Sequence, residues 1–119
     1  MDFNSIFAER TKKLTISIIN EVSELPYSDK VSVIRKQIFR SSSSVAANYR
    51  AMCRARSNKE KYAKICIVVE EADETVFWLE IIEEIKMTNN KDLIKDLKSE
   101  AEEILKVMSS YRKKIGADL

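Results

Sequence analysis

Glycine and proline are almost missing from this chain, and this limits the folds it can adopt more than any other feature. Only Gly116 and Pro26 occur in 119 residues. Tight turns between strands depend on these residue types, so the chain cannot supply the many turns of an all-β fold. With 34% charged and 45% hydrophobic residues, it instead has the composition of amphipathic helices that each bury one face.

The spacing of apolar residues predicts four helical segments joined by short connections. Their expected ranges are residues 5–24, 28–54, 57–87 and 91–115. Short connections make successive helices antiparallel. The predicted fold class is therefore an all-α, antiparallel up-down-up-down four-helix bundle, and we expect residues 1–119 to form a single domain of this kind.

Local signals predict where these helices begin and end. Pro26 should stop the first helix, because proline cannot continue it. Ser28 and Ser57 are expected to be N-caps of the second and third helices, since a serine hydroxyl accepts a hydrogen bond from the first turn. Gly116 is expected to terminate the fourth helix.

Each segment carries an apolar stripe that should face the core, and in the first it comprises Leu14, Ile18, Val22 and Leu25. In the second it comprises Val31, Ile34, Ile38, Val45, Tyr49 and Met52. In the third it comprises Ile65, Val69, Ala72, Val76 and Leu79. In the fourth it is a heptad-like seam of Leu93, Leu97, Ala101, Ile104, Met108, Tyr111 and Ile115.

The chain contains no histidine, which excludes histidine-based catalytic triads and histidine metal sites. We therefore expect no enzyme activity, no catalytic residue, no metal and no cofactor. Glu70 and Asp73, three apart on the third helix, leave open a magnesium site made of carboxylates alone, although solvated surface charge is the favoured interpretation. Cys53 and Cys66 match neither zinc nor redox spacing and are expected to be small, reduced core residues.

No apolar run approaches the length of a membrane span, and the N-terminal residues lack the order of a signal peptide. The expected protein is soluble and cytoplasmic, without a membrane partner.

Charge is strongly uneven along a chain whose net charge is only +2. Residues 26–64 carry ten basic and two acidic side chains, whereas residues 65–90 carry one basic and seven acidic side chains. On the second helix four cations fall within an arc of about 80°. We call these four residues the basic stripe: Lys36, Arg40, Arg50 and Arg54.

The basic stripe is a candidate nucleic-acid surface, because cations spaced along one helix face can follow a phosphate backbone. Arg56 and Lys59, in the turn that follows, extend it. Two alternatives remain open: a merely solvated face, and neutralisation by the acidic part of the third helix, within the bundle or across a subunit contact. No aromatic residue interleaves with the cations, so base stacking is not indicated.

The third helix has apolar residues on a second side, opposite its core stripe. These candidate interface residues are Ile67, Trp78, Ile81 and Ile85. Exposed apolar patches commonly mark an interface, and tryptophan is a favoured anchor, so the pattern predicts a homo-oligomer. The alternative is that a neighbouring helix of the same chain covers Trp78.

Three sequence stretches resemble a known family. They are SVAANYRAMCRARS at residues 44–57, VEEADET at 69–75 and FWLE at 77–80. Together they are similar to the 23S rRNA-intervening sequence proteins, four-helix bundles first noticed as reading frames within 23S rRNA genes. The resemblance extends over essentially the whole chain.

The resemblance implies a non-enzymatic bundle that assembles as a ring-like homopentamer. A relative, the accessory variability protein of diversity-generating retroelements, is a basic pentamer that binds nucleic acid and a reverse transcriptase. The leading interpretation is therefore an oligomeric bundle that binds RNA or DNA through its basic stripe. The alternative is a protein–protein interaction scaffold without nucleic-acid binding.

Overall fold

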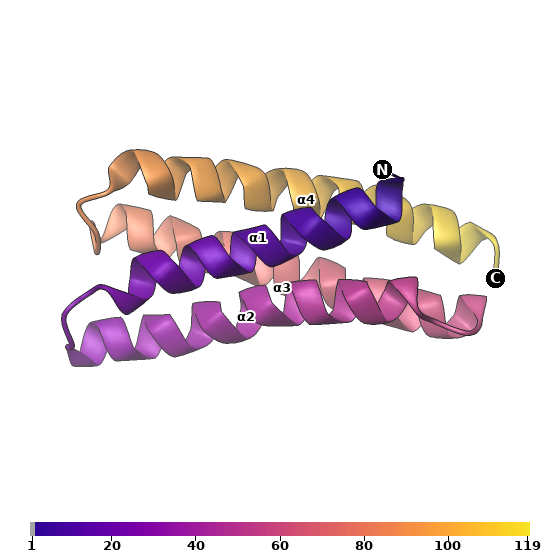
Figure 1. Ribbon diagram of the computed structural model, residues 1–119, viewed down its shortest axis with the longest axis horizontal. Coiled ribbons are helices and arrows are strands. Elements are labelled where there is room, and N and C mark those ends of the chain that lie inside the picture. Colours follow the sequence, from indigo (N-terminus) through magenta and orange to yellow (C-terminus); the bar gives the residue numbers. More distant parts are fainter. Residues whose placement is uncertain (1) are drawn as a thin grey trace.

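The computed structural model describes residues 2–119, which form four long α-helices and no strand. The helices are α1 Phe3–Ser23, α2 Asp29–Cys53, α3 Asn58–Glu84 and α4 Lys91–Ala117. They alternate in direction, and both ends of the chain lie at the same end of the bundle (Figure 1). The predicted all-α, antiparallel four-helix bundle is confirmed.

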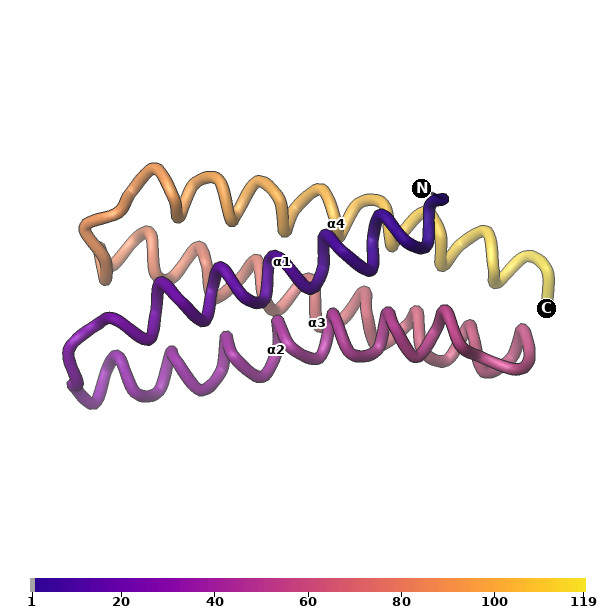
Figure 2. The backbone as a smooth tube through the Cα atoms, in the orientation of Figure 1, coloured from indigo at the N-terminus to yellow at the C-terminus, as the bar shows by residue number. Residues whose placement is uncertain are grey.

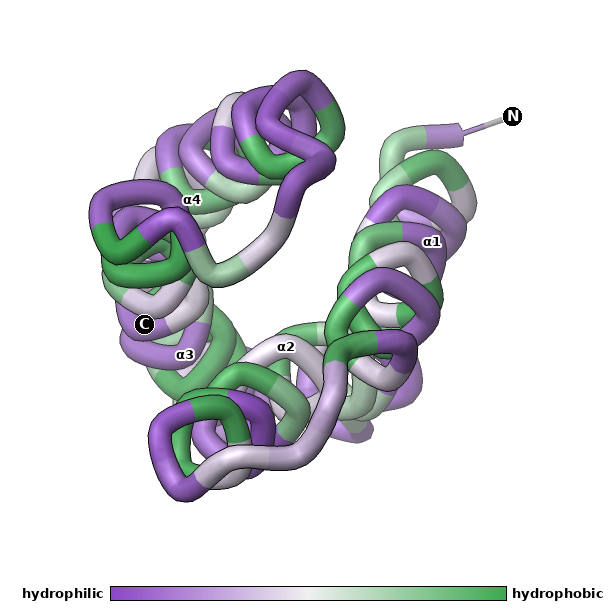
Figure 3. The backbone as a smooth tube through the Cα atoms, turned by 90° about the vertical axis from the view of Figure 1, so that its left-hand side faces the viewer, coloured by the Kyte–Doolittle hydropathy of each residue, from purple (hydrophilic) through white to green (hydrophobic). Residues whose placement is uncertain are grey.

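Each helix packs most closely on its neighbours in the sequence, and among the pairs of helices in contact α1 and α4 pack least closely. Viewed along the bundle, the helices follow one another around the core with their hydrophobic sides turned inward (Figure 3). The backbone trace shows the α1–α2 and α3–α4 connections at one end and the α2–α3 connection at the other (Figure 2). None of the four described helices combines the length and the apolar character needed to cross a bilayer.

Both predicted serine caps are present. The Ser28 hydroxyl accepts a hydrogen bond from the backbone N–H of Val31 at 3.1 Å. The Ser57 hydroxyl accepts one from the N–H of Glu60, also at 3.1 Å. These bonds satisfy N–H groups that have no partner within the helix, and so they define where α2 and α3 begin.

The third helix ends earlier than its apolar spacing predicts. α3 stops at Glu84, and Lys86 then adopts a left-handed conformation with φ of 54°. This conformation closes the helix end, because the N–H of Met87 reaches back to the carbonyl of Ile82 at 3.1 Å. The prediction of a helix to residue 87 was therefore wrong by one turn.

Gly116 does not end α4, as its position suggested. It lies inside the helix, which continues to Ala117, and no glycine of the described chain has a positive φ. A Cβ atom at this position would lie 3.1 Å from the ring of Tyr62. Gly116 thus permits close approach between the end of α4 and the start of α3.

The predicted core stripes of α2 and α3 are buried throughout. The stripe of α4 differs at two places, since Leu93 and Tyr111 are only partly buried and Ile94 is buried instead of Leu93. α1 contributes Phe7, Leu14, Ile18 and Val22 to the same core. The core therefore runs the length of the bundle and draws on all four helices.

A row of buried hydroxyls crosses the middle of the bundle. Thr15 of α1 donates a hydrogen bond to the carbonyl of Ser42 at 2.8 Å. Thr75 of α3 lies 3.0 Å from the hydroxyl of Ser41. These small side chains let α1 and α3 approach α2 closely, and the hydrogen bonds remove the cost of burying them.

Candidate nucleic-acid and subunit interfaces

The basic stripe of α2 is divided by ion pairing. Arg40 lies 2.7 Å from the carboxylate of Glu71 and also pairs with Glu74, both on α3. At this one position the acidic part of α3 neutralises the stripe within the bundle. Arg40 is therefore engaged in holding α2 and α3 together.

The other predicted cations are free of such pairs. Lys36, Arg50 and Arg54 are exposed on α2, and Arg56 and Lys59 are exposed in the turn that follows and the first turn of α3. None of the five forms an ion pair with another residue in the range 2–119. Their charges face solvent and are available to an anionic partner.

A groove of about 640 Å³ lies between α1 and α2. Arg50 and Arg54 line it on the α2 side and Lys12 lines it on the α1 side, while Glu9 is its one acidic residue. Small residues line the space between the two helices: Thr15, Ser43, Ala46 and Ala47. Sequence reasoning missed Lys12, because helical spacing within α1 does not reveal which of its faces lies beside α2.

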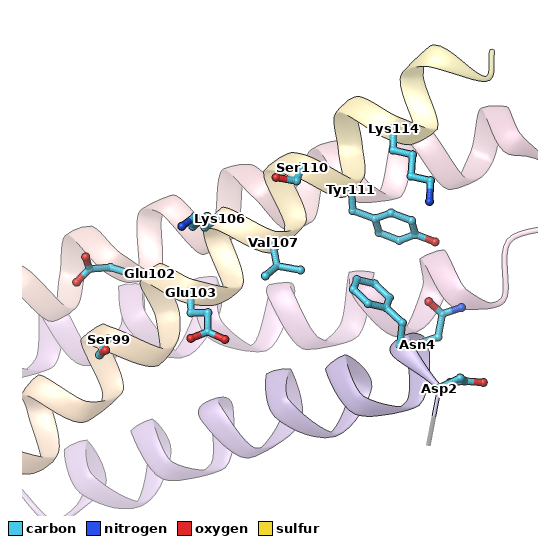
Figure 4. A pocket seen from close by; sticks show the side chains of 11 residues that line it. Asp2, Asn4, Ser99, Glu102, Glu103, Lys106, Val107, Ser110, Tyr111 and Lys114 are labelled. Atoms are coloured by element: carbon cyan, nitrogen blue, oxygen red, sulfur yellow. The ribbon is translucent and has the colours of Figure 1, made fainter.

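A larger groove of about 1160 Å³ lies between the start of α1 and the second half of α4. In the close-up, side chains of α4 reach toward Asp2 and Asn4 at the start of α1 (Figure 4). Its charged residues are of both signs, three acidic and two basic: Asp2, Glu102, Glu103, Lys106 and Lys114. The carboxylate of Glu103 is paired with Arg10, so this groove has no excess of cations. The smaller groove has three basic residues and one acidic residue and therefore suits a polyanion better.

The predicted apolar interface of α3 separates into two parts. Trp78 and Ile81 are partly buried and pack against the core of their own chain. Ile67 and Ile85 are exposed, at 37% and 38%. Phe77, which the helical spacing had not singled out, is 49% exposed and contacts Trp78 edge-on, with 4.9 Å between the ring centroids.

The indole N–H of Trp78 is buried but has no acceptor within residues 2–119. A buried donor without a partner costs about 1–3 kcal/mol. The adjoining surface carries the exposed rings and aliphatic side chains of Phe77 and Ile85. This part of α3 thus combines exposed apolar area with an unsatisfied donor.

The acidic residues and cysteines form no cluster in the described chain. Glu70 and Asp73 are exposed, and no group of three or more Cys, Asp or Glu side chains in residues 2–119 is placed to hold a metal ion. Cys53 and Cys66 are free, partly buried thiols. Burial raises the pKa of the Cys53 thiol.

Comparison with known proteins identifies relatives of this bundle. The family model of the 23S rRNA-intervening sequence protein matches residues 4–110. A crystal structure of a protein of unknown function from the S23 ribosomal protein family of Bacteroides thetaiotaomicron superimposes with a TM-score of 0.81 at 27% sequence identity. The match covers 92% of this chain and 97% of that one. A search of curated proteins found no match. The chain belongs to the family of 23S rRNA-intervening sequence proteins.

Proposed function

We propose that this protein is a non-enzymatic, oligomeric bundle that binds nucleic acid, RNA or DNA, through the cations of α2 that are free of ion pairs. The observation that carries the proposal is the exposure of Lys36, Arg50 and Arg54 along one helix face. These three charges have no partner in residues 2–119, whereas Arg40 on the same face does. The free thiols fit a reducing compartment such as the cytoplasm.

Phosphate contacts explain how such a face would act. Lysine and arginine side chains that meet phosphates release condensed counterions, and this release supplies affinity without reading sequence. The groove beside Arg50 and Arg54 is lined by no aromatic residue, so it offers no platform for stacked bases. Binding is therefore expected to depend little on sequence and strongly on salt.

A titration at several salt concentrations tests this function. Fluorescence anisotropy of labelled RNA and DNA is measured with the full chain between about 50 and 200 mM salt. Three phosphate contacts per subunit give a slope of log K against log salt of about −2.1 on single strands and about −2.7 on duplex. A flat dependence, or no binding at the lowest salt concentration, contradicts the proposal.

We further propose that the bundle assembles as a ring-like homopentamer. Support comes from the exposed apolar residues of α3, Ile67, Phe77 and Ile85. The family resemblance supplies the number five. A ring repeats the α2 cations in every subunit, so avidity would raise a weak affinity by about two orders of magnitude or more.

A protein–protein scaffold is the second candidate function. It is favoured by the α1–α4 groove, whose mixed charges and exposed Phe3 suit a protein surface better than a polyanion. A partner such as a reverse transcriptase would then bind without any nucleic acid. Absence of salt-dependent binding by the unmodified protein, together with a defined complex with such a partner, would favour this function.

A further inference from the structure

We infer that the groove between α1 and α2 binds the sugar–phosphate backbone of a single-stranded nucleic acid, with Lys12 of α1 contributing a phosphate contact. The inference rests on the proposed function and adds where the strand lies and which form it takes. It also assigns a role to a residue of α1, a helix that the basic stripe does not include.

The charge of the groove selects its occupant. Lys12 comes from one helix and Arg50 and Arg54 from the other, so cations lie on both sides of the same space. Glu9 is the single acidic residue of the lining. Opposed cations hold a polyanion between them, whereas the α1–α4 groove has no excess of cations to do so.

The lining of the groove suits a backbone better than a base. Ser43, Ala46 and Ala47 are small and leave the space between the helices open. Ile16 is 48% exposed and offers an apolar contact to a sugar. Because the lining has no aromatic ring on which bases could stack, the contacts within it fall on phosphates and sugars.

The width of the groove favours one strand over two. Packed helices have axes about 8–10 Å apart, whereas a DNA duplex is broader than either of its own grooves, the wider of which is about 12 Å across. A duplex can therefore meet the cations at the rim but cannot reach the small residues between α1 and α2. A single flexible strand can enter the space of about 640 Å³.

The two native thiols report directly on occupancy of the groove. Cys53 lines it, whereas Cys66 lies on α3 and is not part of the lining. Alkylation of both thiols is followed by mass spectrometry on the full chain, with and without oligouridylate or oligothymidylate of about 16 nucleotides. At a ligand concentration ten times its dissociation constant, the rate at Cys53 should fall about tenfold, while the rate at Cys66 stays unchanged.

A pair of neighbouring lysines supplies the matched variants. Lys12 lines the groove, whereas Lys13 is also exposed but does not line it. Lys12→Ala should make the salt slope on single strands shallower by about 0.7, the loss of one phosphate contact. Lys13→Ala should leave the slope unchanged.

Failure of this inference is distinguishable from failure of the proposed function. Salt-dependent binding that leaves Cys53 unprotected, with the same slope in both lysine variants, would overturn the groove and leave the proposed function standing. Equal protection of Cys53 by duplex would overturn the preference for single strands. Binding of duplex without binding of either oligonucleotide would overturn this inference alone, whereas absence of binding by single strands and duplex alike would overturn both proposals.

Discussion

The guanidinium of Arg40 on α2 lies 2.7 Å from the carboxylate of Glu71 on α3. Arg40 therefore has a carboxylate partner, whereas Lys36 and Arg50 have none within residues 2–119, although all three lie on one face of α2. A charge held by a carboxylate of the same chain is poorly available to phosphate. The position of a cation on the helix face is therefore insufficient to predict its role, and its partner on the next helix decides it.

Replacement of Arg40 should consequently affect binding less than replacement of Arg50. Arg40→Ala should leave the salt slope for nucleic acid unchanged and lower the free energy of unfolding by less than about 1 kcal/mol, because the Arg40 side chain is 51% exposed. Arg50→Ala should make the slope shallower. Anisotropy titrations and urea unfolding measure the two effects, and equal losses of slope in both variants would contradict this division of roles.

Lys86, the left-handed residue after α3, allows the backbone strain at the end of this helix to be tested. Lys86 has φ of 54°, a conformation that glycine adopts without a Cβ clash. Lys86→Gly should raise the free energy of unfolding by about 0.5–1 kcal/mol. Lys86→Ala, which keeps a Cβ and loses the same charge, is the control and should bring no such gain in urea unfolding. Equal stability of the two variants would show that the backbone is not strained there.

Tyr49 predicts how stability depends on pH. Burial raises the pKa of its phenol above the ordinary value of 10.0, so the folded protein resists an ionisation that the unfolded chain undergoes. This stabilisation is fully present below pH 10 and declines above it by about 1.4 kcal/mol per pH unit.

Tyr49→Phe removes this titration while keeping the buried ring. Its free energy of unfolding should therefore fall less steeply than that of the protein that keeps Tyr49 between about pH 10 and 11, by as much as about 1.4 kcal/mol. Urea unfolding across the alkaline range measures the difference. Cys53, whose pKa is also raised by burial, interacts with the Tyr49 hydroxyl, so both proteins carry Cys53→Ala in this comparison. Parallel curves would mean that Tyr49 reaches solvent before it ionises.

Phe77 tests the proposed assembly. It is 49% exposed on α3, so Phe77→Glu should leave the monomer folded but place a charge in the subunit contact, where burial of an unpaired carboxylate costs several kcal/mol. Light scattering should then fall to the monomer mass of 13.7 kDa. Tyr27→Glu, at a loop residue that is 75% exposed, is the control and should keep the higher mass. A folded Phe77→Glu variant that remains oligomeric would place the contact elsewhere.

The features predicted best from sequence depend on residues close together in the chain. A serine cap needs only the next three residues, and so Ser28 and Ser57 were placed correctly. The apolar stripes of α2 and α3 follow from the helical repeat alone, and their members are buried. Four helices with short connections then leave an antiparallel bundle as the simplest way to bury those stripes.

The features that were missed depend on how one helix lies against another. The pairing of Arg40 with Glu71 joins residues 31 positions apart. That Lys12 faces α2 can be predicted only if the rotation of α1 about its own axis is known. The sequence predicts Gly116 as a helix end, because no nearby residue reveals that the ring of Tyr62 packs against it. Spacing within one helix contains none of this information.

The salt dependence of binding by a double variant is the sharpest test of nucleic-acid binding through the cations of α2. Arg50→Ala with Arg54→Ala removes two free cations, and Lys95→Ala with Lys113→Ala removes two exposed cations of α4 as the control. Replacing the arginine pair should make the slope of log K against log salt shallower by about 1.4 on single strands, with the mass by light scattering unchanged, while the control should keep the original slope. An unchanged slope in the arginine variant, or an equal change in both, would contradict nucleic-acid binding through α2.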